Sequence, residues 1–242
     1  MSLSWYDYYY LDLGWGELKN HNKKFPKDKP LRLLLHQNKL NVIPPEVFTM
    51  TNLVELCFWK NNITSLPAPI GRLRNLKLLR LHHNKLTHLP DSIGNLTKLE
   101  ELWLGDNNLK TLPFTIGNLV KLRDLGVEFN KLTSIPGSIG RLKNLRYLSF
   151  YQNNISVIPA SIGNLRNLER LWLTSNNLRD LPDSVRNMEK LQKVGLDFNY
   201  FDSVPPCMCA LKNLEWASFS GQKTGKHIPK PETMRKEVRG YW

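Results

Sequence analysis

Residues 99–121 read LEELWLGDNNLKTLPFTIGNLVK, and the same pattern of leucines, asparagine and proline fills most of the 242-residue chain. The pattern is L-x-x-L-x-L-x-x-N-x-L-x-x-L-P-x-x-I-G-x-L-x-x, with the asparagine at its ninth position. That asparagine recurs every 23 residues, at Asn38, Asn61, Asn84, Asn107, Asn130, Asn153, Asn176 and Asn199, and a further step of the same length ends at Gln222. The prolines keep the same interval from Pro44 to Pro205. An uninterrupted period of this length predicts a protein built from stacked repeats.

Each part of the repeat has a physical role that its residue types suggest. The L-x-L centre has a period of two, which predicts a short strand with one buried face. A buried turn leaves backbone groups unpaired, and an asparagine amide can satisfy them, so stacked repeats predict an asparagine ladder. Proline then begins a return segment that cannot extend the strand. The glycines of I-G-x-L, such as Gly94, Gly117, Gly140 and Gly163, are expected to permit a tight turn.

A single 23-residue unit cannot bury its own leucines, whereas stacked units share one continuous core and align their strands in a parallel sheet. Residues 30–222 resemble the leucine-rich repeat family, in its 23-residue class of plant intracellular Ras-group-related, Ras-pathway scaffold and bacterial repeat proteins. The resemblance implies an α/β solenoid shaped as a horseshoe. A parallel β-sheet would line its concave face, with short helical, 3-10 or extended segments on the convex face. The resemblance also implies a scaffold for protein-protein interaction through the concave face.

The chain is predicted to divide into the repeats, residues 30–222, and two caps. Residues 1–29 are interpreted as an N-terminal cap with a degenerate repeat, which keeps Leu11, Leu13 and Leu18 but has Gly16 in place of the asparagine. Residues 223–242 are interpreted as a C-terminal cap, in which Pro231 is expected to begin a short helix. One face of that helix would close the core with side chains four residues apart, those of Met234, Val238 and Trp242.

A longer repeat of 69 residues is superimposed on the 23-residue one. Residues 102–113 read LWLGDNNLKTLP and residues 171–182 read LWLTSNNLRDLP, and their fifth positions continue as Trp103, Gly126, Ser149, Trp172, Gly195 and Ser218. This order indicates that a three-repeat unit was duplicated. In a parallel sheet each tryptophan lies beside the following glycine and can cover its bare backbone. The sequence leaves open whether the two tryptophans are such lids or anchors for a partner.

The third, fifth, seventh and eighth positions of each repeat are expected to face solvent on the concave side. Aromatic side chains there are candidate anchors, because binding hot spots are rich in tryptophan and tyrosine. Trp59, Tyr147 and Tyr151 are the strongest candidates. Together with neighbouring acids they give the predicted partner-binding set of Trp59, Glu101, Trp103, Asp106, Asp124, Glu128, Tyr147, Tyr151 and Trp172. Phe129 and Phe198 hold the eighth position, where the resemblance implies a partly buried phenylalanine, so both are expected to belong to the core.

The formal charge of +13 at pH 7 does not lie on the concave face. The concave positions hold five bases and six acids, namely Arg32, Lys60, Arg80, Arg170 and Lys193 against Glu55, Glu101, Asp106, Asp124, Glu128 and Asp197. Nucleic-acid binding needs clustered lysine and arginine where the ligand sits, so it is not expected through the concave sheet. The basic outer surface gives an alternative function, which is binding of an acidic partner, a polyanion or a membrane surface.

Motifs for catalysis are not found in the sequence, which has no phosphate-binding glycine loop, nucleophile elbow or kinase motif. His36, His82 and His83 fall on the concave face, but His36 and His82 are two repeats apart, about 10 Å by strand spacing. That separation is too large for one metal ion. Cys207 and Cys209 replace an apolar residue and a glycine of the repeat and are interpreted as structural thiols. We therefore expect a protein that is not an enzyme and has no cofactor and no metal.

The sequence has no run of eighteen apolar residues that could span a membrane. Its start, MSLSWYDYYY, lacks the pattern of a signal peptide, and its three cysteines do not suggest a disulfide-stapled secreted fold. The protein is therefore expected to be cytoplasmic, with an exported or secreted effector as the alternative if a leader is missing from the sequence. It is expected to act as a monomer that binds a protein partner.

Overall fold

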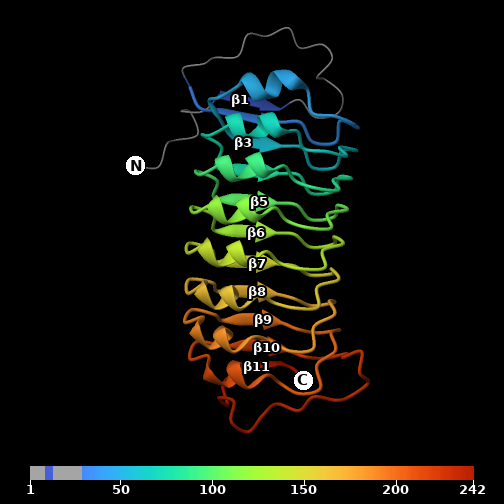
Figure 1. Cartoon of the computed structure of the whole chain (residues 1–242), viewed down its shortest axis with the longest axis vertical. Helices are drawn as coiled ribbons and strands as arrows, with labels where there is room; N and C mark the ends of the chain where they lie inside the picture. Colours follow the sequence, from blue (N-terminus) through green and yellow to red (C-terminus); the bar gives the residue numbers. More distant parts are fainter. Residues whose placement is uncertain (1–8, 13–28) are drawn as a thin grey trace.

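The computed structural model describes residues 9–12 and 29–242, which form a curved stack of repeated units, here called rungs (Figure 1). Eleven parallel strands make one sheet, and their order in the sheet is their order in the chain. The strands are β1 (Tyr9–Asp12), β2 (Leu31–Leu34), β3 (Leu53–Cys57), β4 (Leu78–Arg80), β5 (Glu101–Trp103), β6 (Asp124–Gly126), β7 (Tyr147–Ser149), β8 (Arg170–Trp172), β9 (Lys193–Gly195), β10 (Trp216–Ser218) and β11 (Arg239–Tyr241).

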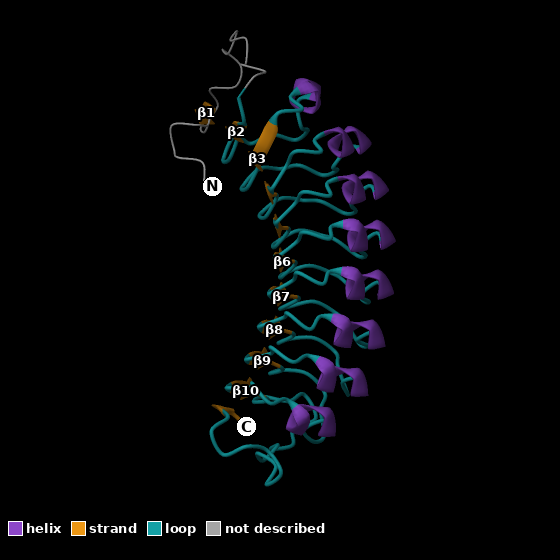
Figure 2. Cartoon of the chain, turned by 90° about the vertical axis from the view of Figure 1, so that its left-hand side faces the viewer, coloured by secondary structure: helices purple, strands orange, loops and turns teal. Residues whose placement is uncertain are grey.

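A short 3-10 helix follows the proline of each rung. The helices are η3 (Pro45–Thr49), η4 (Ala68–Arg72), η5 (Asp91–Asn95), η6 (Phe114–Asn118), η7 (Gly137–Arg141), η8 (Ala160–Asn164), η9 (Asp183–Asn187) and η10 (Pro206–Ala210). Figure 2 shows the strands on the concave side of the arc and the helices on the convex side, which confirms the horseshoe expected from the repeat. Within the described residues, no helix has the length and apolar character needed to cross a membrane.

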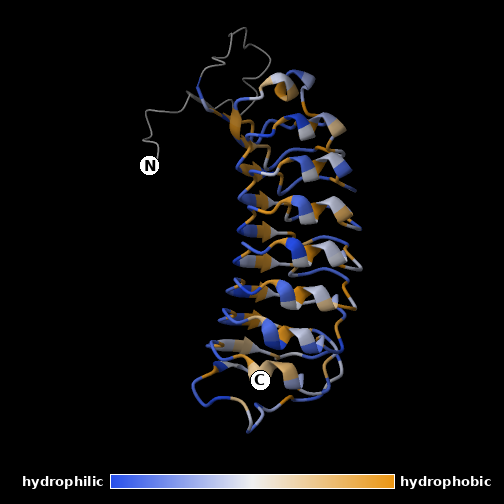
Figure 3. Ribbon diagram, turned by 60° about the vertical axis from the view of Figure 1, so that its left-hand side comes forward, coloured by the Kyte–Doolittle hydropathy of each residue, from blue (hydrophilic) through white to orange (hydrophobic). Residues whose placement is uncertain are grey.

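The core lies between the sheet and the 3-10 helices and runs without a break through the described rungs. The leucines of each L-x-L strand point into it, and Leu102 and Leu104, for example, are completely buried. Isoleucine and leucine from the convex side, such as Ile116 and Leu119, meet them from the other direction. Figure 3 shows this hydrophobic pattern repeating from rung to rung. Burial of a leucine of this kind contributes about 1.5–3 kcal/mol, so the stacking of rungs stabilises the fold.

The predicted asparagine ladder is present and connects each rung to its neighbours. The Nδ2 of Asn107 donates to the carbonyls of Leu81 and Leu104 at 3.0 and 2.9 Å, and its Oδ1 accepts from the Leu86 N–H at 2.9 Å. Gln222 makes the same bonds at the end of the ladder, where its Oε1 accepts from a backbone N–H at 3.0 Å. Every such bond satisfies a backbone group that the turn would otherwise bury unpaired.

The glycines of I-G-x-L have a different role from the one expected. Gly94 and Gly117 do not have a positive φ, so a tight turn does not explain them. A Cβ added to Gly117 would instead lie 2.4 Å from the Ser138 carbonyl oxygen on the next 3-10 helix. Glycine is needed here because neighbouring helices of the convex face approach too closely for a side chain.

The N-terminal cap is only partly covered by the structure. β1 pairs with β2 in parallel register, with Tyr9 beside Leu31, so residues 9–12 extend the sheet by one strand. The predicted cap residues Leu13, Gly16 and Leu18 lie outside the described residues. The boundaries of the caps stay a prediction.

The helix predicted from Pro231 in the C-terminal cap is wrong. Residues 232–237 form turns, and Arg239–Tyr241 form β11, which pairs in parallel with β10. A strand is favoured because the open edge of β10 presents a row of backbone groups that another strand pairs in register. The Phe219 N–H, for example, donates to the Tyr241 carbonyl at 2.6 Å. The three apolar side chains still cover the core, since Met234 and Val238 are buried and Trp242 stacks on Phe219 with ring centroids 5.8 Å apart.

Candidate partner-binding face

The concave face displays the third, fifth, seventh and eighth positions of every rung as four columns that cross the sheet. The parallel register puts equivalent positions side by side, so that Glu101 lies beside Asp124, and Asp124 beside Tyr147. Adjacent strands are about 4.8 Å apart, and residues 23 apart in sequence therefore become direct neighbours. The charge and hydrophobicity of any part of this face are therefore set by residues from a few successive rungs.

Both tryptophans of the duplicated segment cover the neighbouring glycine. The Cε3 atom of Trp103 lies 2.6 Å from the point where a Cβ on Gly126 would stand, and that of Trp172 lies 2.7 Å from the same point on Gly195. Neither glycine could carry a side chain without displacing the indole. The lid contact, one of the two interpretations left open by the sequence, is therefore present in both copies. The indoles are still partly exposed.

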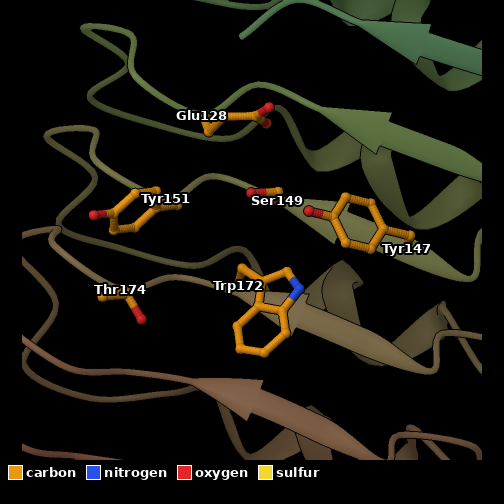
Figure 4. Close-up of a pocket in the computed structure, with 6 residues that line it drawn as sticks. All are labelled: Glu128, Tyr147, Ser149, Tyr151, Trp172 and Thr174. Carbon is orange, nitrogen blue, oxygen red and sulfur yellow. The ribbon is translucent and has the colours of Figure 1, made fainter. Parts of the chain in front are cut away.

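A hollow of about 330 Å³ opens on the concave face beside strands β7 and β8. Its lining consists of Glu128, Tyr147, Ser149, Tyr151, Trp172 and Thr174 (Figure 4). Four of these six belong to the predicted set, and the structure brings them together from three successive rungs. The Tyr147 hydroxyl points towards Ser149, which lies between the two tyrosines. The hollow thus combines aromatic rings with a carboxylate and two small hydroxyl side chains.

Glu128 is the charged member of this lining, and one of its two carboxylate oxygens lacks a hydrogen-bond partner. Its Oε2 atom is buried and has no hydrogen-bond partner among the described residues. Burial raises the pKa of the Glu128 carboxyl, while a backbone hydrogen bond, the charge of His83 and a hydrogen bond with Ser149 oppose that effect. Burying an ionised carboxylate without a partner is costly. A hydrogen-bond donor or a cation beside Oε2 would offset part of this cost.

The remaining predicted acids line the rungs on the N-terminal side of the hollow. Burial, and then repulsion by Glu101, raise the pKa of Asp124. Glu101 accepts a hydrogen bond from the Trp103 Nε1 at 3.0 Å, and Asp106 contacts the His83 Nδ1 at 2.5 Å. The pKa of the Tyr147 hydroxyl is also raised, and burial is the largest cause. The acidic positions thus lie on adjacent rungs on the N-terminal side of the hollow, with Asp124 partly desolvated and Asp106 exposed.

Trp59 lies several rungs away from the hollow and is held in a stack. Its ring is sandwiched between His36 and His82, with centroid distances of 5.1 and 5.8 Å and interplanar angles of 1° and 8°. Lys60 adds a cation–π contact at 5.5 Å. Both faces of the indole are therefore covered by imidazole rings. The stack makes Trp59 a weaker anchor candidate than its sequence position suggested, because a partner can reach only its edge.

The expectation that Phe129 and Phe198 belong to the core is wrong. The two side chains are 47% and 51% exposed. The cause is the backbone, because the eighth position has a positive φ in every rung from Gln37 to Gly221, and this conformation turns the side chain outward. Phe129 then packs edge-on against Tyr151 with ring centroids 5.0 Å apart. In the other rungs the eighth position holds a polar residue or glycine, and this pattern in the sequence indicates an exposed position.

Ser149 and Thr174 were not predicted as members of the site. They occupy the fifth and seventh positions between aromatic neighbours, and their short side chains leave the space that becomes the hollow. The sequence shows small residues beside large ones in these columns, with Ser149 before Trp172 at the fifth position and Thr174 after Tyr151 at the seventh. Size and charge, the properties that mark an anchor in the sequence, do not mark the gaps between anchors.

The structure gathers no metal-binding group among the residues that it describes. His36 and His82 face Trp59 from opposite sides, so they stack and do not converge. Burial, with the charges of His83 and Arg80, lowers the pKa of His82 to about 4, which keeps its ring neutral at pH 7. Cys207 is a free, buried thiol whose pKa is raised to about 11, mainly by burial. A thiol of this kind is protonated and inert at neutral pH.

Comparison with known proteins identifies the kind of repeat. The family model described as a leucine-rich repeat region matches residues 16–135 and 134–227. Among solved structures, a leucine-rich repeat protein of Leptospira interrogans superposes with a TM-score of 0.81 at 34% sequence identity, over 88% of this chain and 54% of that one. A search of the curated proteins gave no match.

Two plant receptor structures are also similar. The plant peptide hormone receptor RGFR1, solved in complex with RGF2, gives a TM-score of 0.73 at 34% identity, over 79% of this chain and 32% of that one. The ectodomain of the Arabidopsis thaliana receptor kinase GASSHO1/SCHENGEN3, in complex with CASPARIAN STRIP INTEGRITY FACTOR 2, gives 0.60 at 28% identity, over 80% and 27%. This chain therefore spans about half of the bacterial relative and a third or less of the plant receptors.

Proposed function

The chain belongs to the leucine-rich repeat family, and from this premise we propose that it is a non-catalytic module that binds a protein partner through its concave face. The observation that carries the proposal is the hollow at β7 and β8, where Tyr147, Tyr151 and Trp172 surround space large enough for a partner's side chain. Hot spots of protein interfaces combine such aromatic anchors with a pocket.

The similar receptors support a protein or peptide as the kind of ligand. Both plant structures are complexes of a receptor with another named factor, and RGFR1 is described as a peptide hormone receptor. Because this chain covers only part of those receptors, their ligands are not carried over to it. The likeness supports the general class of partner, and the residues of this chain support the place of binding.

The proposed site has a centre and a surround. Its centre is the lining of the hollow, and its surround consists of the predicted concave residues that do not line it, which are Glu101, Trp103, Asp106, Asp124 and Trp59. Trp103 is connected to the centre because its ring contacts Tyr147 at 5.8 Å between centroids. Trp59 belongs to the far end of the surround, because it stacks between two histidines.

The aromatic residues of the centre are held before any partner arrives. Trp172 packs against Trp216 with centroids 5.5 Å apart, and Tyr151 packs against Phe129. Immobilising a mobile side chain on binding costs about 0.5–1.5 kcal/mol. Side chains that are already fixed avoid most of this cost. The rigid sheet and the ring contacts therefore favour binding without a large rearrangement.

A selection from displayed random linear peptides tests the proposal. The wild-type chain is expected to select peptides, and the double variant Tyr147→Ala/Tyr151→Ala is expected to lose them while its thermal unfolding changes little. Phe114→Ala serves as the control, because Phe114 is an exposed aromatic residue on the convex side and should not affect selection. Peptides that bind the double variant as well as the wild type would place the binding site elsewhere.

A second candidate function rests on the distribution of positive charge. The C-terminal turn of each 3-10 helix and the segment that leads from it to the next strand stack along one edge of the solenoid, here called the basic edge. They carry thirteen exposed bases and four acids, which are Arg72, Arg74, Lys77, Lys98, Lys121, Arg123, Arg141, Lys143, Arg146, Arg166, Arg186, Lys190 and Lys212 against Glu100, Glu169, Glu189 and Glu215. Most of the net charge of +13 is therefore on this edge. A dense row of one sign attracts an anionic partner.

Retention on immobilised heparin tests the basic edge. The triple variant Arg141→Gln/Lys143→Gln/Arg146→Gln should elute at a lower salt concentration than the wild type, since binding to a polyanion weakens as charges are removed. The double variant Tyr147→Ala/Tyr151→Ala should elute with the wild type. Retention that ignores salt, or that is unchanged in the triple variant, would exclude this function for the edge.

A further inference from the structure

The middle of the concave face is acidic although the protein is basic. The twelve concave positions within residues 101–152 carry four acids and no lysine, arginine or histidine. The nearest bases of the concave face border this region, Arg80 on β4 before it and Arg170 on β8 after it. Acids that cluster against the sign of the whole molecule raise the local concentration of cations. The region includes four of the six residues that line the hollow, Glu128, Tyr147, Ser149 and Tyr151.

The acids of the face differ in how far the protein itself satisfies them. Asp197 accepts hydrogen bonds from Ser218, from the Ser220 N–H and Oγ at 2.9 and 2.8 Å, and from Thr174. By contrast, the Oε2 of Glu128 is buried at the hollow without a partner among the described residues. This oxygen lies against Gly126, and a rotation of the Glu128 side chain towards the hollow would offer it to a donor from outside.

The rings around Glu128 offer π faces to a cation at the same place. Tyr147, Tyr151 and Trp172 line the hollow with it, and Figure 4 shows the carboxylate and the rings from three successive rungs around one space. The protein already places a guanidinium on one of these rings, since the Cζ of Arg170 lies 5.8 Å from the Tyr147 centroid. Cation–π contacts of this kind are worth about 0.5–2 kcal/mol, with arginine the more frequent partner.

We propose that the hollow binds the side chain of an arginine carried by an extended segment of the partner, with its guanidinium between the aromatic rings and hydrogen-bonded to Glu128. This inference rests on the proposed function, because it names the chemistry of the partner at that site. An apolar side chain would leave the Oε2 atom of Glu128 buried without a hydrogen-bond donor. A lysine could supply charge, but the planar guanidinium both stacks on rings and donates to a carboxylate through two N–H groups.

The peptide selection tests this inference when it is run with Glu128→Gln. Peptides selected by the wild type are expected to share an arginine at one position, and Glu128→Gln should lose that preference while still selecting peptides through the tyrosines. Glu46→Gln is the matched control, because Glu46 is an exposed glutamate on the convex side. Selection of peptides without a shared basic residue would overturn the inference and leave the proposed function intact. Selection of no peptide by the wild type would overturn both.

A double-mutant cycle with one selected peptide then locates the arginine. Replacing that arginine by citrulline, a neutral isostere, should weaken binding to the wild type at least about tenfold, as expected for the loss of a close charge pair. The same replacement should have little effect on binding to Glu128→Gln. Equal losses for both proteins would show that the arginine binds elsewhere and would overturn the inference.

Discussion

The indole of Trp103 lies directly over Gly126, with its Cε3 atom 2.6 Å from the position that a Cβ would take. The same relationship joins Trp172 and Gly195, 69 residues further along the chain. In a parallel sheet the two members of each pair are lateral neighbours, and the indole shields backbone that glycine leaves bare. The large side chain of the tryptophan therefore complements the missing side chain of the neighbouring glycine. Only the exposed part of the indole can contact a partner.

Gly126→Ala should destabilise the protein by about 1–3 kcal/mol, the usual cost of an added methyl group in a packed site. In a Trp103→Ala background the same substitution should cost less, because the added Cβ then meets no indole and only the movable end of Glu128, whose Oε2 is 2.9 Å away, has to shift. Urea denaturation of the four proteins measures this coupling. Gly137→Ala is the control, since a Cβ there has no neighbour within 4 Å. Additive effects of the two substitutions would show that Trp103 does not act as a lid.

Asn130→Ala should destabilise the protein strongly, because it removes several buried hydrogen bonds together. Its Nδ2 donates to the Leu104 and Glu128 carbonyls at 3.0 Å, and its Oδ1 accepts from the Leu109 N–H at 2.9 Å. Each buried group left unpaired costs about 1–3 kcal/mol, so a loss above about 2 kcal/mol is expected. Asn154→Ala, at an exposed asparagine, is the control. Equal midpoints of chemical unfolding for both variants would contradict a structural ladder.

The repeat predicted the parts of the fold that depend on periodic burial and on paired backbone groups. The positions of Leu102, Leu104 and Asn107 follow from what a stacked strand and a buried turn require of any residue. Even the substitution of Gln222 for asparagine could be understood, because an amide with one more methylene makes the same bonds. These features were predictable because they repeat in every rung.

Features that depend on contacts between particular columns could not be predicted in the same way. The sequence does not show that His36 and His82 stack on the two faces of Trp59, because this depends on the orientation of all three rings. The β11 strand replaced a plausible helical pattern because the edge of β10 needed a partner, which no local pattern records. Candidate site residues were found where they are large or charged. Ser149 and Thr174 were missed because their contribution is the space that they leave.

Gln152→Gly should leave stability unchanged or increase it by up to about 1 kcal/mol. Gln152 is an exposed eighth-position residue with a φ of 50°, where a residue with a Cβ is strained by about 1–2 kcal/mol. Glycine removes that strain, although it adds about 0.5–1 kcal/mol of unfolded-state entropy. Asn154→Gly, two residues later and without a positive φ, should only destabilise. Thermal unfolding of the two variants distinguishes them, and equal destabilisation would contradict the backbone argument.

Glu128→Gln should raise the melting temperature at pH 7, and the gain should disappear under acidic conditions. Burial raises the pKa of the Glu128 carboxyl above its ordinary value of 4.5, so the folded state binds the proton more tightly than the unfolded state does. Its contribution to stability is therefore complete below pH 4.5 and is lost as the pH rises through the raised pKa. The neutral amide has no such loss. Melting temperatures at pH 7 and at pH 4 measure the difference.

The same substitution separates a structural role of Glu128 from a binding role. A residue kept for the fold should destabilise the protein when it is replaced, whereas a carboxylate kept for a partner's cation should stabilise the free protein and weaken the complex when it is neutralised. Glu128→Gln is therefore expected to melt later and to bind arginine-containing peptides less tightly. Glu46→Gln, at an exposed site, should change neither property. A Glu128→Gln variant that melts earlier than the wild type at pH 7 would show that the fold uses the charge.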